Sequence, residues 1–401
     1  MNKLFILLIL LSSFIYSQDS TKHLLINLPS GINVNLSGKI EFEYVDVEGK
    51  GGSLNNDNNL NQEVQTRSPF LRIDKAVLKF KAIYTKYLSL RFGLRFNDSN
   101  AYLDRIYLLY QNPNHRLEIG RNKPAIALSR KIEAYPLIGT AFWRGRQYHI
   151  DYEKQLSFFK IGSSLSLKRP LSFKAPLEDN SFPMLVYGNM PKSNKDWDGV
   201  TTELGIRGEF GIGALSILGW GYWGKLYDDY DWKLLYDQFT YYREEQGEVS
   251  AKNANRDHYW MGIRSELDLS YFFTRGEYVF SKDGFLDRNG FYIEIRKLFN
   301  PLFLSKKPVL FLARYGGLNI EPNGNWEAEL NSPHTWNRSL LTIAAVYNYT
   351  EHLKIKFEYY IAGEKTGDKK EIAELDNNGE GRIYQPNISD NQLLIQFDLT
   401  F

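Results

Sequence analysis

The sequence predicts an all-β fold, a transmembrane antiparallel β-barrel of about sixteen strands closing over residues 31–401. Apolar and polar residues alternate along one segment after another, which is the pattern of strands with two different faces. Short turns alternate with long polar loops, and 15% of the residues are aromatic. An apolar face toward lipid and a polar face toward a water-filled interior are typical of membrane barrels.

Composition excludes several other classes of protein. The chain carries 49 Lys+Arg against 47 Asp+Glu, and this balance gives no field that would attract nucleic acid. Beyond the N-terminus no apolar run reaches the length of about twenty residues that a membrane-spanning helix needs. Cysteine is absent, which excludes disulfides and cysteine-ligated metal. No nucleotide-binding or metalloprotease motif is present, so we expect no cofactor and no metal.

The N-terminus has the order of a secretory signal peptide. Lys3 is followed by an apolar run up to Leu11 and by a small, polar run up to Ser17. We expect a signal peptide over residues 1–17, cleaved between Ser17 and Gln18, and then a short N-terminal segment over residues 18–30. The alternative is a buried N-terminal strand or helix.

The first predicted strand, GINVNLSGKIEFEY at residues 31–44, sets the pattern for the others. Ile40 and Phe42 point to one side, whereas Glu41 and Glu43 point to the other. The same alternation recurs, cleanly, in 88–97, 159–165, 203–210, 258–266, 291–296, 353–361 and 391–401. It is less regular in 70–84, 102–111, 115–121, 143–152, 214–223, 270–280, 309–316 and 338–348. Several tyrosines stand near the predicted strand ends, as in aromatic girdles at membrane interfaces: Tyr44, Tyr84, Tyr87, Tyr110, Tyr152 and Tyr359.

The last segment, NQLLIQFDLTF, alternates strictly up to the terminal Phe401. An uncovered strand of this kind would be an aggregating edge, so something must pair with it. We expect it to pair with residues 31–44 and close the ring. A terminal aromatic resembles the sorting signal that the barrel assembly machinery of the outer membrane reads, and Phe401 is therefore the predicted assembly signal.

Two kinds of connection join the predicted strands. Short turns lie at 96–101, 111–115 and 348–352, and long polar loops lie at 49–65, 169–199, 225–255, 318–336 and 364–387. Outer-membrane barrels place short turns at the periplasmic rim and long loops outside the cell. No convincing amphipathic helix interrupts the strands. The alternative architecture is a soluble, secreted β-sandwich, which would leave the terminal Phe401 and the two kinds of loop unexplained.

Residues 67–129 carry a more specific pattern. A basic strand pair is followed by an Asp-containing strand and by the turn Gly120-Arg121-Asn122-Lys123-Pro124, and a basic segment then continues to about residue 152. This region resembles the phosphate-selective porin O/P family, although Ala125-Ile126 stands where that family has Pro-Phe. The resemblance implies a sixteen-stranded, often trimeric, water-filled channel that is narrowed by an inward-folded loop.

Inward-facing basic residues are the main functional candidates. Alternation places them on strands at Lys79, Lys81, Arg91, Arg95, Arg105, Lys160, Arg207, Arg264, Arg296, Lys354 and Lys356. The resemblance adds Arg121, Lys123, Arg144 and Arg146 near the constricting loop. Such residues lower the barrier for anions in a narrow pore. The alternative is that they only pair with the inward acids Glu41, Glu43, Glu118, Glu203, Glu266, Glu294 and Glu358.

The expected function is that of a porin in the outer membrane of a Gram-negative bacterium, passing small hydrophilic solutes with a preference for anions such as phosphate. Expected partners are outer-membrane lipid, the assembly machinery, the solutes and, by the resemblance, two further copies in a homotrimer. An enzyme is not expected, because His149 and Asp151 share a strand face without a nucleophile motif. Asp228, Asp229 and Asp231 could hold Ca²⁺ but fit a solvated loop better. The alternative function is a non-conducting barrel that acts as a binding or surface-interaction protein.

Overall fold

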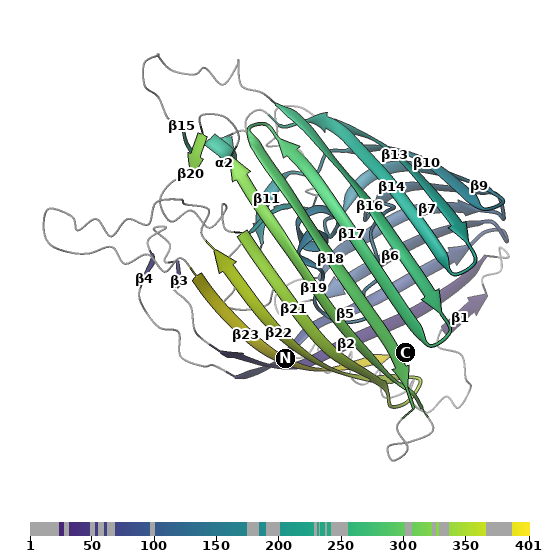
Figure 1. The fold of residues 1–401 in the computed structure, drawn as a ribbon. Coiled ribbons are helices and arrows are strands. Elements are labelled where there is room, and N and C mark those ends of the chain that lie inside the picture. The colour runs from purple at the N-terminus through teal and green to yellow at the C-terminus, as the bar shows by residue number, and fades with distance from the viewer. Residues whose placement is uncertain are drawn as a thin grey trace, which may run out of the picture.

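The computed structural model (Figure 1) describes residues 24–27, 32–48, 53–54, 60–61, 69–96, 101–174, 184–189, 201–227, 231, 233–236, 239–241, 256–300, 307–322, 326–328, 337–365 and 387–401. The expected signal peptide and its cleavage point lie outside these residues. Most of each predicted long loop also lies outside them.

Sixteen antiparallel strands form one closed sheet, which confirms the predicted fold class (Figure 1). They are β2 (Asn33–Glu48), β5 (Phe70–Ile83), β6 (Leu88–Phe96), β7 (Ala101–Gln111), β8 (His115–Asn122), β9 (Gln147–Leu156), β10 (Phe159–Leu167), β13 (Thr202–Ile212), β14 (Leu215–Lys225), β16 (Asp257–Leu269), β17 (Phe272–Asp283), β18 (Leu286–Phe299), β19 (Val309–Pro322), β21 (Asn337–Asn348), β22 (Leu353–Lys365) and β23 (Asn387–Thr400). Each pairs with the next strand of this series, as expected for an up-and-down barrel.

Smaller elements do not belong to the sixteen-stranded ring. The strand β1 (Leu24–Asn27), within the expected N-terminal segment, pairs with the start of β2. The other short elements are β3 (Ser53–Leu54), β4 (Leu60–Asn61), β11 (Leu171–Lys174), β12 (Met184–Tyr187), α2 (Lys233–Tyr236), β15 (Phe239–Tyr241), β20 (Trp326–Ala328) and the π-helix η1 (Gly139–Trp143). No helix was predicted at the position of η1. Among the described residues, no helix is long and apolar enough to cross a membrane.

The last strand closes the barrel against the first, as predicted. The register runs from Lys39 opposite Thr400 to Glu48 opposite Asn391. Backbone hydrogen bonds continue to the end of the chain, because Gly38 and Phe401 exchange N–H and C=O groups at 2.8 and 3.1 Å. A side chain at Gly38 would collide with the Phe401 ring. Glycine at this position therefore leaves room for the terminal aromatic ring on the outer surface.

The two faces of the wall confirm the predicted alternation. Phe42 is 43% exposed on the outer surface, whereas its neighbours Glu41 and Glu43 are buried on the inner side. Tyrosines are exposed beside the short turns, as in an aromatic girdle: Tyr84, Tyr87, Tyr110, Tyr152, Tyr271 and Tyr349. The outer face thus suits lipid, and the inner face carries the charges.

Two β-bulges interrupt the alternation, and each inserts one aspartate. Between Ile73 and Lys75 the residue Asp74 has no partner on β2, and between Leu103 and Arg105 the residue Asp104 has none on β6. A bulge bends its strand and turns a side chain toward a new direction. Strict counting by two from either end of β5 or β7 therefore misplaces the residues beyond the bulge.

Candidate pore and its lining

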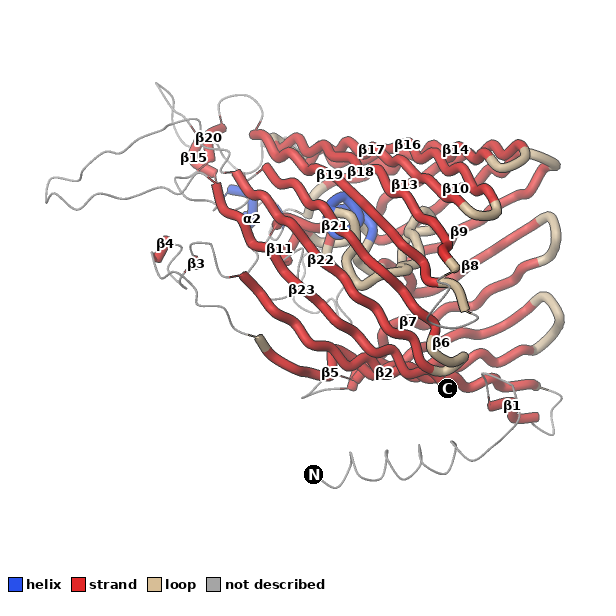
Figure 2. The backbone as a smooth tube through the Cα atoms, turned by 60° about the horizontal axis from the view of Figure 1, so that its bottom comes forward, coloured by secondary structure: helices blue, strands red, loops and turns tan. Residues whose placement is uncertain are grey.

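The connection between β8 and β9, residues 123–146, folds into the barrel. It contains η1, which is drawn as a coil in the interior of the barrel (Figure 2). The sequence analysis assigned residues 143–152 to a strand, but β9 begins only at Gln147. Pro124 and Pro136 cannot donate to a sheet, and the apolar run between Pro136 and Trp143 is buried. The inward loop, defined as residues 123–146, thus crosses the lumen as a packed element.

An aromatic core joins the inward loop to one side of the wall. Tyr222 and Trp260 stack with ring centroids 4.5 Å apart, and Phe142 of η1 and Tyr187 of β12 pack beside Trp260. All four rings are buried. Because buried aromatic rings dominate the energetics of a core, this cluster holds both the inward loop and the β11–β12 hairpin against β14 and β16.

Wall arginines bind the carbonyl groups of these inward segments. Arg264 donates to Ile126 O at 2.8 Å, Arg314 to Ala134 O at 2.9 Å and Arg288 to Leu185 O at 2.9 Å. Each guanidinium also pairs with a carboxylate of the wall. Buried backbone carbonyls need such donors, so these arginines support the inward segments, and they are not free to meet a solute.

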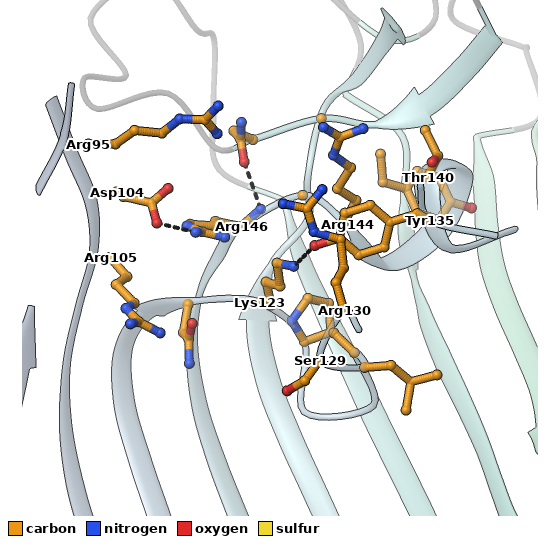
Figure 3. Close-up of a pocket in the computed structure, with 18 of the residues that line it drawn as sticks. Arg95, Asp104, Arg105, Lys123, Ser129, Arg130, Tyr135, Thr140, Arg144 and Arg146 are labelled. Atoms are coloured by element: carbon orange, nitrogen blue, oxygen red, sulfur yellow. Dashed lines mark hydrogen bonds and ion pairs between the residues drawn. The ribbon is translucent and has the colours of Figure 1, made fainter. Parts of the chain in front are cut away.

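A basic cavity of about 620 Å³ lies in the lumen between the inward loop and the wall of β2 and β5–β8 (Figure 3). Eleven basic residues line it, against the three acidic residues Glu41, Asp104 and Glu118. The basic residues are Lys39, Lys75, Lys79, Arg95, Arg105, Arg116, Lys123, Arg130, Arg144, Arg146 and Lys174. We call this space the basic cavity. A second cavity of about 290 Å³ at the short-turn rim shares Lys39 and Lys79 with it.

Comparison with known proteins identifies the architecture. No protein-family model and no curated protein matches the chain. Among solved structures, OmpT of Vibrio cholerae matches with a TM-score of 0.56 and 10% identity over 94% of this chain and 100% of that one. Salmonella typhi OmpF matches with a TM-score of 0.55 and 9% identity over 94% of this chain and 100% of that one. Pseudomonas putida OprB matches with a TM-score of 0.53 and 8% identity over 92% of this chain and 94% of that one. The chain folds as a porin-like outer-membrane barrel. At such low identity the likeness shows the fold alone.

Six of the fifteen basic candidates from the sequence line the basic cavity of this porin-like barrel: Lys79, Arg95, Arg105, Lys123, Arg144 and Arg146. Lys81 and Arg91 form a cross-strand pair nearer the short turns and are not among the described residues that line it. Arg121 is not among them either, since it donates to the carbonyls of Leu103 and Asp104 at 3.1 and 2.6 Å beside the β7 bulge.

Other basic candidates form ion pairs with carboxylates of the wall, although only Glu294 is among the acids that the pairing alternative named. Five of them have such partners: Lys160 with Glu209, Arg207 with Asp151, Arg264 with Glu277, Arg296 with Glu294 and Lys356 with Asp398. His149 contacts Glu118 at 3.0 Å, so it does not form a pair with Asp151. Of the three aspartates considered for Ca²⁺, Asp231 accepts a hydrogen bond from Lys168 Nζ at 2.7 Å. Asp228 and Asp229 lie outside the described residues.

Sequence reasoning missed five lining residues, namely Lys39, Lys75, Arg116, Arg130 and Lys174. Alternation could have found three of them. Lys39 shares a face with Glu41, Lys75 with Lys79 and Arg116 with Glu118. Arg130 and Lys174 lie in the inward segments, where apolar and polar residues do not alternate and the sequence cannot show which way a side chain points.

Three cations of the inward loop surround one tyrosine (Figure 3). The distances to the centroid of the Tyr135 ring are 4.6 Å from Lys123 Nζ, 4.8 Å from Arg130 Cζ and 5.1 Å from Arg144 Cζ. The face of an aromatic ring attracts cations and so helps to gather like charges here. Burial lowers the pKa of Lys123 and of Arg144, and the charge of Arg130 lowers both further. Such crowding favours the entry of an anion.

Lys174, on β11, gives the basic cavity a charge that depends on pH. Burial, and then the charges of Arg144, Arg95 and Arg130, lower its pKa to about 7. The side chain still reaches the water of the lumen, which moderates the shift. The ammonium is present below this pKa and lost above it. We therefore expect the anion preference of a channel to fall modestly from pH 6 to pH 9, as measured by zero-current potentials.

A Lys174→Arg variant serves as the control for this pH dependence, because arginine stays charged throughout that range. It should keep the anion preference at pH 9. An equal fall in the variant would assign the pH dependence to another group.

Proposed function

We propose that the protein is a porin of the outer membrane of a Gram-negative bacterium that lets small hydrophilic solutes diffuse passively, with a preference for anions such as phosphate. The observation that carries the proposal is the basic cavity, which is lined by eleven basic side chains and three carboxylates. Some of the eleven form ion pairs, but Lys79 and Arg105 line the cavity without an ion pair to a carboxylate among the described residues. The attraction between unit charges 4 Å apart is about 1 kcal/mol in water and about 4 kcal/mol at an effective dielectric constant of about 20. A local excess of charge can therefore select ions in a chain that is nearly neutral.

A route along the lumen supports passage. The basic cavity reaches Arg144 and Asn189 of the inward segments at one end and Lys39 and Lys79 at the other. The rim cavity continues from Lys39 and Lys79 to His352 and Phe401 beside the short turns. Solute would thus follow the wall of β2 and β5 while the aromatic core keeps the opposite side dry.

Single-channel recording in planar lipid bilayers tests the proposal. We expect discrete open-channel currents, and in a KCl gradient a zero-current potential on the anion side. Added phosphate should reduce the chloride current if phosphate also enters the basic cavity. A cation-selective channel would contradict the anion preference and leave a general porin.

A non-conducting binding barrel is the second candidate. It is the alternative that the sequence left open, and Phe142, Tyr187 and Trp260 fill part of the lumen with buried side chains. In that case the purified, folded protein would give no channel currents in bilayers. The candidate enzyme pair has no support in the geometry of His149, and we propose no enzymatic activity.

The assembly of the barrel is part of the proposal. We infer insertion by the barrel assembly machinery after removal of the signal peptide, with Phe401 as the sorting signal. A homotrimer is supported by one similar structure, OmpT of Vibrio cholerae, which is described in a trimer form. Its TM-score is 0.54 at 11% identity. Cross-linking of the native membrane protein distinguishes a trimer from a monomer.

A further inference from the structure

Glu133 occupies the point where the inward loop reaches the far wall of the barrel. Its carboxylate lies 3.2 Å from Lys75 Nζ on β5, 3.4 Å from Gln396 Nε2 on β23 and 3.9 Å from Lys356 Nζ on β22. It also pairs with Arg130 of the inward loop itself. The side chain is only 6% exposed. One carboxylate thus connects the loop to three strands that are distant in the sequence.

The neighbouring backbone and side chain strengthen this attachment. Glu133 N donates to Glu358 Oε1 at 2.6 Å. Ile132 is fully buried against Leu312 and Ala344 of β19 and β21. Ile132 is therefore fixed to the wall by apolar contacts, and the next residue, Glu133, by ionic contacts.

The charges at this point are balanced by a lysine. Carboxylate oxygens of Glu41, Asp74 and Glu133 lie within 4.8 Å of one another, an arrangement that could hold a metal ion. Lys75 Nζ contacts all three of them, at 2.5 Å from Asp74 and 3.2 Å from Glu133. The ammonium group occupies the position of a cation, and the loop completes the cluster by supplying Glu133.

Arg130 extends this cluster to the basic cavity. It pairs with Glu133 on one side and lies 4.8 Å from the centroid of Tyr135 on the other. Burial raises the pKa of Glu133, because it disfavours the ionised carboxylate. The positive charges of Arg130, Lys75 and Lys356 have the larger, opposite effect and hold the pKa of Glu133 well below its ordinary value. The carboxylate is therefore ionised at neutral pH.

We propose that Glu133 is a positioning residue for the pore: its contact with Lys75 holds the inward loop against the wall, and its contact with Arg130 aims that guanidinium at the basic cavity. Together the two contacts set the width and the anion preference of the passage. The inference rests on the proposed channel function, because width and preference have meaning only if solute passes.

The first test replaces Glu133 by Gln, which keeps the shape and removes the charge. We expect open-channel current noise to increase several-fold, with a larger and more variable conductance, because the loop loses its ionic contact. Glu153→Gln is the matched control, since Glu153 is a wall carboxylate that pairs with Arg207 and belongs to no contact of the inward loop. Its currents should equal those of the wild type.

A charge-based contact also predicts a rescue. Lys75→Gln leaves three carboxylates without their ammonium group, so repulsion should release the loop more strongly than Glu133→Gln does. Adding Glu133→Gln to Lys75→Gln removes one of the repelling charges and should bring the currents part of the way back. Purely additive damage in the double variant would show that the residues act by packing, and would overturn the proposal.

Hydrogen exchange gives a readout that does not need a channel, because water reaches the loop inside the barrel. Lys131 is exposed next to the buried segment 132–135. We expect faster exchange of the backbone amides of residues 132–135 in folded Glu133→Gln than in the wild type or Glu153→Gln, since amides exchange when their segment opens locally. Unchanged exchange together with unchanged currents contradicts the inference. If wild-type protein opens no channel, the proposed function fails, and the exchange rates still decide whether Glu133 holds the loop.

Folding of each variant is checked by heat-modifiable migration in gels. Should Glu133→Gln fail to fold, Lys75→Gln breaks the same contact from the wall side. The same two measurements on it then decide the question. A folded Lys75→Gln variant with wild-type noise and wild-type amide exchange would overturn the proposal.

Discussion

Replacing Lys79, Arg95 and Arg105 together by glutamine is expected to move the zero-current potential in a KCl gradient strongly toward the cation side. All three line the basic cavity, from β5, β6 and β7. Within the described part of the chain, the one ion pair that these three residues form is the 3.8 Å contact of Arg95 with Asp74. Removing three of the eleven basic side chains reduces the excess of positive charge beside the carboxylates of the cavity, so anions lose part of their advantage over cations. Little stability should be lost, because exposed or half-exposed charge pairs contribute about 0–1 kcal/mol.

The matched control replaces Lys81 and Arg91 on the same strands. Both were candidates by alternation, yet neither lines the basic cavity. We expect a much smaller shift from this double variant. An equal shift from both sets would assign the selectivity to the mouth of the barrel, and no shift from either would refute the anion preference. High salt should weaken the wild-type preference, since the screening length is about 10 Å at 0.1 M.

Deleting Phe401, or replacing it by Asp, is expected to lower the assembled barrel many-fold while synthesis remains normal. The terminal residue supplies the last backbone hydrogen bonds between β23 and β2, and its ring lies against Gly38. Gly38→Val should have a similar effect from the other strand, because the added side chain would occupy the position of the ring. Heat-modifiable migration of membrane fractions measures the assembled protein.

Gly219→Ala is the control for the glycine substitution. Gly219 is a strand glycine of β14, and an added Cβ there would meet nothing within 4 Å. Assembly of this variant should equal that of the wild type. If Gly38→Val also assembles normally, the contact between Gly38 and Phe401 does not contribute to closure. Normal surface levels without Phe401 would contradict its assignment as the assembly signal.

Alternation along the strands was sufficient to predict the barrel and its two faces. Phe42, Ile293 and Phe357 were predicted to share the apolar face, and all three are exposed on the outer surface. The closure between residues 31–44 and the last strand followed from the need to cover an edge. These features are local or generic, because the side-chain period of a strand is fixed by its backbone.

The inward loop could not be predicted in the same way. Its apolar residues do not recur at a fixed spacing, and the end of its apolar run, at Trp143, was assigned to a strand. Its position depends on partners such as Glu358 and Arg264, which lie far away in the sequence. The bulges at Asp74 and Asp104 were also missed, since an extra residue in a strand leaves no mark in composition.

The sequence by itself determined that the strands close into a barrel with an apolar outer face and charges inside. Only the tertiary structure decided which charges face the open lumen. Arg207 and Arg264 share the inward face with Arg95, yet they are buried in ion pairs, whereas Arg95 lines the basic cavity. Alternation reports the side of the wall to which a residue points. Whether it meets a carboxylate, the inward loop or water depends on segments that folding brings to the same height of the barrel.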